Sequence, residues 1–400
     1  MTGVWSALLP MACAALAATA ELPQIPGLTL TEVRLPSSVD GAEQPIVVGV
    51  PEAYDPGTPT PLLVGLHTWS ADYLQRVQPY GAEAGRRGWL VVLPNFRGPN
   101  TTKNPQPTQA GGSLLAQHDI VDARQYMVEH YAVDPERIYL TGDSGGGHMT
   151  LLMAGKYPDL WTAAAAWVPV TDLREWWEVQ NGYAAQVEAI TGGKPGDSAA
   201  VDFEYLRRSP RTFMTNLAPL PVLLAHGDRD PTIPAEQSWR SFRVLASVPG
   251  HHTLLHVFSG GHEGRTRFGL DWLAEHTRPA APPTELHLVS DESKSYYWSE
   301  LTIAEPLTLG RADLVLGADA LSVVTANLSA LRLDLTGLPL PENALTVSVV
   351  SERPLALTIA SAPEGAEVAC EGTWARRVAG DGIALEVDPS PEARSLQITW

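Results

Sequence analysis

The sequence predicts an α/β domain, with a mostly parallel sheet and helices on both faces, followed by an all-β, sandwich-like module. Three observations lead to this prediction. From Pro61 onward, short apolar runs alternate with helical segments, which is typical of a parallel sheet. An apolar run at residues 137–141 ends in a glycine-rich turn that leads into a helical segment. Beyond residue 283, apolar and polar residues alternate with the period of strands only.

The individual elements follow from local patterns. Residues 28–35 alternate as a half-buried strand, and residues 44–50 form its hairpin partner across Gly41. Further strands are expected at residues 62–66, 89–93, 137–141, 163–168, 221–225 and 253–258. Helices are expected at residues 114–131, 149–156 and 266–276, and the stretch at 100–112, rich in Pro, Gly, Thr and Asn, predicts a loop.

The glycine-rich turn carries a serine at its centre. Residues 142–146 read Gly-Asp-Ser-Gly-Gly, which is the G-x-S-x-G spacing of a nucleophile elbow between a strand and a helix. In so sharp a turn, the positions two before and two after the serine must be nearly free of side chain, and Gly142 and Gly146 meet that need. We therefore expect Ser144 to be an exposed nucleophile. The alternative is a glycine-rich turn in which the serine has no role.

A serine nucleophile needs a base and a group that orients the base. In elbow-type folds the acid and the histidine follow the serine in that order, each after a later strand. Asp228 and Asp230 follow the strand at 221–225, and His262 follows the next strand in a glycine-rich loop. We expect His262 to be the base and Asp230 the acid, because Asp230 lies farther into its loop. Asp228 is expected to hold the loop through backbone hydrogen bonds and is the alternative acid.

The backbone near the serine predicts an oxyanion hole. One donor is the N–H of Gly145, the residue after the nucleophile. The second is expected from the loop after the strand at 62–66, where Thr68 or Trp69 is the candidate. Trp69 offers an aromatic wall beside the acyl carbon, or it packs under a cap. His148, one helical turn after Ser144, either lines the site or is a packed core histidine, and the second role is favoured.

Several segments together resemble α/β-hydrolases of the prolyl-oligopeptidase-like group. They are residues 119–123, 133–139, the elbow around Ser144, 226–230 and 261–262. The resemblance covers about residues 28–278 and implies the α/β-hydrolase fold with a Ser-His-Asp triad. The group includes peptidases as well as polysaccharide and feruloyl-type esterases. Its oligopeptidases carry a large N-terminal propeller that gates the site, whereas few residues precede the first expected strand here, and this difference favours an esterase.

An insertion separates the strands at 163–168 and 221–225. It is about 50 residues long, a length that usually indicates function, and residues 171–215 of it are expected to cap the site. Trp176, Trp177 and Arg208 are its candidate substrate-binding residues. Because adjacent helix positions do not share a face, the two tryptophans cannot both point inward. Plain packing of each tryptophan and a structural ion pair of the arginine are the alternatives.

The composition of the chain argues against some classes of binding partner. The net charge of −18 and the pI near 5.0 argue against nucleic acid or an anionic membrane as a partner. No metal-ligand cluster, P-loop or dinucleotide glycine pattern is evident, so no metal or other cofactor is expected. Residues 4–17 are apolar and residues 18–20 form a small-x-small cleavage site. Residues 1–20 therefore predict a signal peptide and a secreted or periplasmic protein.

Residues 279–284 form a Pro/Ala linker between the hydrolase domain, residues 21–278, and a β-rich domain, residues 285–400. Trp298, Trp374 and Trp400 of the β-rich domain either form a carbohydrate-binding platform or are buried, and burial is favoured. The expected function is that of a secreted serine hydrolase cleaving carboxylic esters on polysaccharides or aromatic acyl groups. A serine peptidase of the same fold is the alternative, and a non-catalytic binding protein is a third reading.

Overall fold

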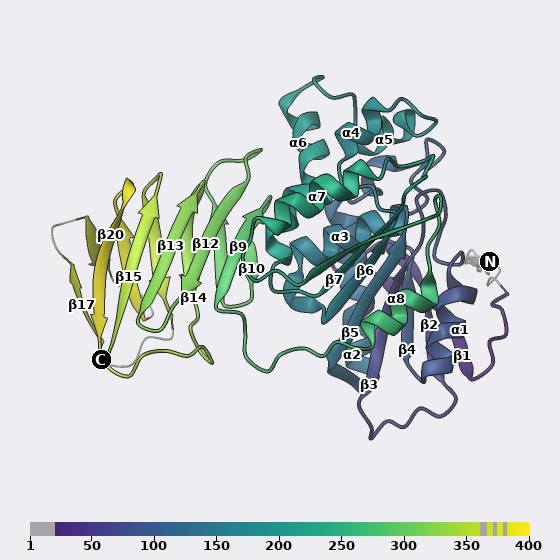
Figure 1. Ribbon diagram of the computed structural model, residues 1–400, viewed down its shortest axis with the longest axis horizontal. Helices are drawn as coiled ribbons and strands as arrows, with labels where there is room; N and C mark the ends of the chain where they lie inside the picture. The colour runs from purple at the N-terminus through teal and green to yellow at the C-terminus, as the bar shows by residue number, and fades with distance from the viewer. Residues whose placement is uncertain (1–20, 361–365, 371–373, 379–381) are drawn as a thin grey trace, which may run out of the picture.

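The structure, a computed structural model, describes residues 21–360, 366–370, 374–378 and 382–400. An α/β domain and a β-rich domain lie side by side along the long axis of the molecule (Figure 1). The predicted signal peptide, residues 1–20, lies outside the described residues. Within the described ranges, no helix is long and apolar enough to cross a bilayer.

One eight-stranded sheet forms the centre of the α/β domain. Its strands are β1 (Leu28–Pro36), β2 (Glu43–Pro51), β3 (Thr60–Leu66), β4 (Leu90–Pro94), β5 (Val133–Asp143), β6 (Ala163–Trp167), β7 (Val222–Gly227) and β8 (Thr253–Phe258). They lie in the order β1-β2-β4-β3-β5-β6-β7-β8. The β1–β2 hairpin and the β2–β4 pair are antiparallel, and the remaining pairs are parallel. The prediction of a mostly parallel sheet is confirmed.

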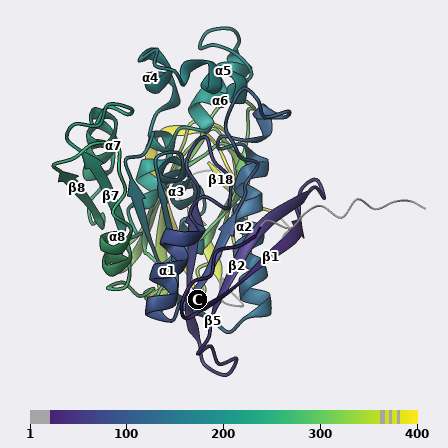
Figure 2. The same ribbon diagram turned by 90° about the vertical axis from the view of Figure 1, so that its right-hand side faces the viewer.

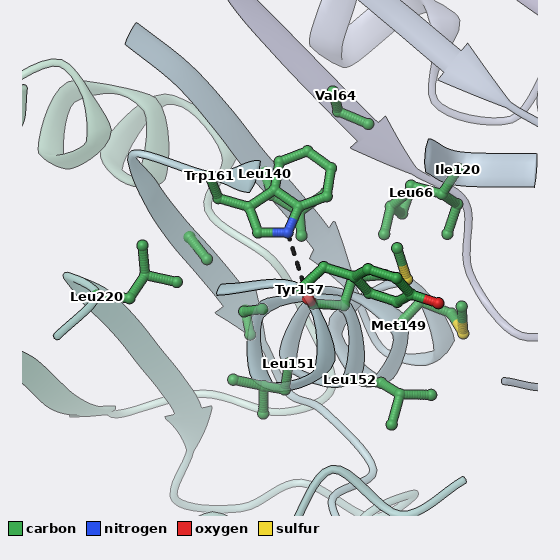
Figure 3. Close-up of a cluster of buried hydrophobic side chains, with 14 of the residues drawn as sticks. Val64, Leu66, Ile120, Leu140, Met149, Leu151, Leu152, Tyr157, Trp161 and Leu220 are labelled. Atoms are coloured by element: carbon green, nitrogen blue, oxygen red, sulfur yellow. Dashed lines mark hydrogen bonds between the residues drawn. The ribbon is translucent and has the colours of Figure 1, made fainter. Parts of the chain in front are cut away.

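Helices cover both faces of this sheet (Figure 2). They are α1 (Val77–Arg87), α2 (Leu114–His130), α3 (Gly145–Lys156), α7 (Glu236–Ala246) and α8 (Thr266–Leu273). Helices α1 and α8 bury apolar residues against one face, and α2 and α3 against the other. Ile138 and Leu140 of β5 point to the α2–α3 side and Tyr139 to the opposite side, because successive strand residues alternate. Figure 3 shows Leu140 among the side chains of the α2–α3 cluster.

Of the helices that cover the sheet, α1 and α7 were not predicted. Residues 77–87 contain Gly81 and Gly85, which weaken a helical pattern. The helix forms because Tyr80 and Ala84 are fully buried against the sheet, and such tertiary packing outweighs weak propensity. Helix α3 begins at Gly145, earlier than the predicted 149.

The insertion between β6 and β7 is helical. It contains α4 (Leu173–Glu178), α5 (Ala184–Thr191), α6 (Ala199–Arg207) and a 3₁₀ segment, η3 (Pro210–Leu217). Helices α4 to α6 lie together at one end of the domain (Figure 1) and bury their own apolar cluster, which includes Trp176 and the active-site loop residue Trp69. The η3 segment packs instead against α3 in the main core.

The β-rich domain consists of two six-stranded sheets. Its strands are β9 (Glu285–Ser290), β10 (Lys294–Tyr296), β11 (Ser299–Ile303), β12 (Gly310–Leu316), β13 (Ala320–Ala326), β14 (Leu328–Leu333), β15 (Ala344–Ser351), β16 (Leu355–Ile359), β17 (Glu367–Cys370), β18 (Ala375–Val378), β19 (Ile383–Val387) and β20 (Ser390–Thr399). Alternate residues of β12 and β13 are buried in a shared apolar cluster, so the period-2 pattern of the sequence is the inward face of these sheets. Trp298 and Trp374 belong to this cluster, with 5% and 9% exposure, and Trp400 packs against it. The tryptophans therefore form no exposed platform, and packing is the role that the structure supports.

The turn between β9 and β10 joins the two domains. Asp291 in this turn has a fully buried carboxylate, 2.8 Å from Nζ of Lys156, which is also fully buried. Nε of Arg207, at the end of α6, lies 2.7 Å from the same carboxylate. The Asn216 amide donates to the Val289 carbonyl at 2.9 Å and accepts from the Val289 N–H at 2.8 Å. The β-rich domain is thus attached to the nucleophile helix α3 and to the insertion.

Candidate active site

Ser144 lies between the end of β5 and the start of α3. Its φ of 56° and ψ of −118° place it in a conformation that residues other than glycine rarely adopt. Backbone hydrogen bonds hold it there, because its N–H donates to the Trp167 carbonyl and its carbonyl accepts from the His148 N–H, both at 2.8 Å. The predicted turn is therefore present, with the serine at its apex.

The glycines around Ser144 make this turn possible. A methyl group added at Gly142 would overlap the backbone of Gly146. One added at Gly146 would lie 2.5 Å from the carbonyl oxygen of Leu66 in β3. Because each clash involves backbone, no side-chain movement can relieve it, so only glycine fits at the two positions that the sequence singled out.

The structure brings Ser144, His262 and Asp230 together from three separate loops. Oγ of Ser144 lies 2.8 Å from Nε2 of His262, and Nδ1 of His262 lies 2.7 Å from Oδ2 of Asp230. The arrangement favours the tautomer in which Nδ1–H donates to the carboxylate and Nε2 accepts from the serine hydroxyl. This is the geometry of a Ser-His-Asp catalytic triad.

Asp230 is held as a carboxylate. Burial raises its pKa, but hydrogen bonds from His226, from His262 and from the N–H groups of Thr232 and Ile233 outweigh burial and lower it. Nε2 of His226, near the end of β7, lies 3.3 Å from Oδ2 of Asp230, so this histidine also contacts the acid.

Asp228 occupies a different position. Its side chain is 47% exposed and accepts a hydrogen bond from the N–H of Gly260 at 3.0 Å. This contact ties its loop to the loop that carries His262, as the sequence predicted for Asp228. Asp230 is therefore the aspartate placed to orient the histidine.

The candidate oxyanion donors are reduced from three to two. The N–H of Thr68 donates to Oε1 of Gln75 at 3.0 Å, so it is not free to bind an oxyanion. Among the described residues, no hydrogen bond occupies the N–H groups of Gly145 and Trp69. The two backbones are in close contact, because a methyl group added at Gly145 would clash with the Trp69 nitrogen. Trp69 and Gly145 therefore remain as the donor pair, and Thr68 is corrected to a residue that shapes the loop.

A cavity of about 420 Å³ opens in front of Ser144. The loop after β3, the His262 loop, Val168 and Tyr183 form its walls. Arg76 and Asp143 also line it, and they form an ion pair with each other. Sequence reasoning missed Tyr183 and Arg76 as site residues, because neither belongs to a motif and both reach the cavity only through the packing of distant segments.

The proposed substrate contacts of the insertion need correction. Trp176 is 1% exposed and lies behind Trp69, with ring centres 4.8 Å apart, while its Nε1–H donates to the Thr232 carbonyl. Nε1–H of Trp177 donates to Glu188. Neither tryptophan lines the cavity. They support the site from behind, because helix α4 faces the Trp69 loop and not the open pocket.

Arg208 is likewise structural. It is 5% exposed, and its guanidinium donates to Glu204 and to the carbonyls of Ala110 and Thr108. A guanidinium committed to these acceptors and buried away from the cavity has no role in binding substrate. The structural ion pair, which was the alternative, is the observed one.

His148 is a core residue, as the sequence favoured. It is fully buried, and its Nε2–H donates to the Arg208 carbonyl at 2.7 Å. Nδ1 has no hydrogen-bond partner among the described residues. Burial lowers the pKa of His148 to about 4, so the ring is neutral near pH 7.

No group of three or more His, Cys, Asp or Glu side chains in the described ranges is arranged to hold a metal ion.

Comparison with known proteins places the α/β domain in a family. Residues 82–278 match the prolyl oligopeptidase family. An acetylxylan esterase from Coprinopsis cinerea is 29% identical over 153 residues, which are 36% of this chain and 40% of that protein. An acylamino-acid-releasing enzyme from Rattus norvegicus is 26% identical over 171 residues, or 40% of this chain and 22% of that enzyme. The chain thus spans less than half the length of these two relatives.

A solved structure shows the same fold. A puromycin-hydrolyzing peptidase from Mycobacterium tuberculosis superposes with a TM-score of 0.52 at 24% identity, covering 64% of this chain and 39% of that one. The match in sequence pattern, the mostly parallel sheet and the elbow at Ser144 agree with one another. The α/β domain of this protein belongs to the prolyl oligopeptidase family and has the α/β-hydrolase fold.

Proposed function

We propose that this protein is a secreted serine hydrolase that cleaves carboxylic esters, with polysaccharide-linked or aromatic acyl esters as substrates. The observation that carries the proposal is the continuous hydrogen-bond chain from Ser144 through His262 to Asp230. A hydroxyl, an imidazole and a buried carboxylate in this order form an activated nucleophile at neutral pH.

The steps of the proposed ester hydrolysis follow from the positions of these three side chains. Ser144 Oγ attacks the ester carbonyl while Nε2 of His262 accepts its proton, and Asp230 stabilises the resulting imidazolium. The N–H groups of Gly145 and Trp69 donate to the oxyanion of the tetrahedral intermediate. His262 then protonates the leaving alcohol, and the acyl group stays on Ser144. Water, deprotonated by His262, repeats the sequence and releases the acid.

Two features support an ester over an amide. One relative, 29% identical over 153 residues, is named an acetylxylan esterase, which is an enzyme that cleaves esters. The cavity is lined by Tyr183, whose ring suits a sugar or an aromatic acyl group, whereas the side chain of Trp69 is 2% exposed and packs in the insertion. The similarity to an acylamino-acid-releasing enzyme supports the second candidate, a serine peptidase with the same triad.

Secretion rests on residues 1–20, which have an apolar run and a small-x-small cleavage site. Amino-terminal sequencing of the exported protein tests it, with Glu21 as the expected first residue. Retention of residues 1–20 on exported protein would contradict cleavage there.

Kinetics on a matched panel test the reaction. We expect kcat/KM for acetyl, feruloyl and glucuronoyl esters to exceed that for acylaminoacyl and proline-containing peptides. Ser144→Ala should lower kcat by about 10⁶ and abolish labelling by a fluorophosphonate, because the nucleophile is lost. Ser70→Ala is the control. Ser70 lines the same cavity but is not the proposed nucleophile, so this variant should keep its labelling by the fluorophosphonate. Efficient peptide cleavage without ester cleavage would move the assignment to the peptidase, and an unlabelled wild-type protein would favour a binding protein.

A further inference from the structure

Arg76 is a cation in the wall of the Ser144 cavity that the triad chemistry does not use. It lies at the start of α1, and its side chain is 24% exposed. None of the other described residues lining the cavity is a Lys or Arg. Arg76 is therefore the Lys or Arg side chain that the described cavity lining offers to a bound substrate.

The guanidinium is fixed in place but only partly paired. One of its Nη atoms contacts Asp143, the residue before Ser144, whose carboxylate is 4% exposed. The ring of Tyr80 lies 6.0 Å from the guanidinium carbon. Nε is buried and has no hydrogen-bond partner among the described residues. A guanidinium has five N–H donors in a rigid fork, so the contact with Asp143 leaves donors unused.

The nearby carboxylates of Asp143 and Glu263 do not prevent an anion from binding at Arg76. Asp143 faces Arg76 and balances its charge, but a paired guanidinium still offers N–H donors in the geometry that a carboxylate matches. Glu263 also lines the cavity, but its side chain is 56% exposed, so water screens its charge. Arg265 lies 3.6 Å from Glu263 and further offsets it.

We propose that Arg76 binds a carboxylate of the substrate, so that the preferred esters carry an anionic group close to the scissile bond. A uronic acid unit and a dicarboxylic half-ester both offer this chemistry. The inference rests on the proposed ester hydrolysis, and it gives Arg76 a substrate-binding role in place of Arg208, the arginine that the sequence suggested. Because Asp143 and Tyr80 hold the guanidinium before substrate arrives, binding loses little side-chain freedom.

Matched ester pairs test the specificity. On the acyl side, 4-nitrophenyl hydrogen glutarate is compared with 4-nitrophenyl pentanoate, and on the alcohol side, 4-acetoxybenzoate with phenyl acetate. We expect the wild type to have a KM about tenfold or more lower for the charged member of one pair, as for a charge-assisted hydrogen bond. The pair that shows the difference identifies the part of the substrate that Arg76 contacts.

Variants assign the preference to this residue. Arg76→Gln should remove the preference, so that the ratio of KM for the neutral ester to KM for the charged ester falls from about ten to about one. Arg76→Lys keeps the charge but not the fork and should retain part of the preference. Arg267→Gln removes the charge of an arginine that is 73% exposed and lies outside the cavity lining, and it should leave the preference intact. Equal losses on both esters in Arg76→Gln, or an unchanged preference, would overturn the proposal.

A binding measurement separates this inference from the ester assignment. Succinate should raise the melting temperature of the wild type and of Ser144→Ala, whereas succinamide should not. This readout needs no turnover and no variant of Arg76, whose loss leaves Asp143 buried without its cation. A protein that cleaves no ester but is stabilised by succinate would contradict the proposed function and leave the carboxylate site standing. Equal responses to succinate and succinamide would overturn the site itself.

Discussion

Two buried carboxylates of this protein, Asp230 and Asp291, have similar surroundings and different consequences. Both side chains are fully buried and each meets two basic partners. His262 and His226 flank Asp230, and Lys156 and Arg207 flank Asp291. For both, burial raises the pKa but the partners outweigh it and lower the pKa.

The two carboxylates differ in what their basic partners contact. The side chain of His262 is 23% exposed and contacts Ser144, so its proton can be exchanged with a substrate in the cavity. Lys156 is fully buried and contacts a carboxylate of another domain. Each site is thus a buried carboxylate with two basic neighbours. At Asp230 the carboxylate orients the histidine of the proposed triad, and at Asp291 it links the two domains. Helix α3 connects the two places, because it begins beside Ser144 and ends at Lys156.

Breaking the Asp230 pair should change chemistry. Asp230→Asn is expected to lower kcat by about 10⁴, because the amide favours the wrong imidazole tautomer. Its melting temperature should change far less than its activity. Steady-state kinetics and thermal unfolding measure the two effects. Asp228→Asn is the matched control and should keep near wild-type kcat, since Asp228 contacts the Gly260 N–H and not His262. If Asp228→Asn is the inactive variant instead, the acid has been misassigned.

Breaking the Asp291 pair should change stability. Asp291→Ala is expected to lower the free energy of unfolding by about 3–5 kcal/mol, because it leaves the buried Lys156 without its carboxylate. Urea unfolding measures the loss. The double variant Lys156→Met, Asp291→Leu removes both charges and should recover much of it. A single variant as stable as the wild type would show that the two domains are not coupled through this contact.

A third buried group, His148, is expected to make the stability of the protein depend on pH. Burial lowers its pKa to about 4, below the value near 6.5 of an exposed histidine. As pH falls through 6.5 the unfolded chain takes up the proton first, so stability present above pH 6.5 is lost progressively down to about pH 4. The loss amounts to about 3 kcal/mol, at 1.36 kcal/mol per pKa unit. Asp230, whose pKa is lowered from 3.8, contributes its own loss only at lower pH.

His148→Gln should flatten this pH dependence, measured as the free energy of unfolding in urea between pH 7 and pH 4.5. A glutamine amide can still donate to the Arg208 carbonyl that His148 contacts. His130→Gln is the control, because His130 is an exposed histidine on α2. An unchanged slope in His148→Gln would assign the acid sensitivity to other groups.

Local spacing in the sequence was sufficient to single out the residues that the structure brings together as the proposed triad. The G-x-S-x-G turn requires two bare positions around Ser144, and backbone clashes in the structure explain why only glycine meets that requirement. The order of serine, aspartate and histidine after successive strands follows from the parallel sheet, whose strands all end at one edge. The choice between Asp228 and Asp230 rested on loop position, and the contacts of the two residues agree with it.

Only the tertiary structure decided the partners of charges and aromatic rings. Arg76 reaches the cavity and Arg208 does not, although Arg208 was the candidate substrate-binding residue in the sequence. Lys156 and Asp291 meet although they belong to different domains. The physical reason is that strand period, helix period and turn chemistry act between neighbours in the chain, whereas an ion pair or a ring contact forms only where folding brings distant segments within a few ångströms. The sequence by itself therefore determined the fold class and singled out the three residues of the proposed triad, and the packing of distant segments decided which side chains surround them.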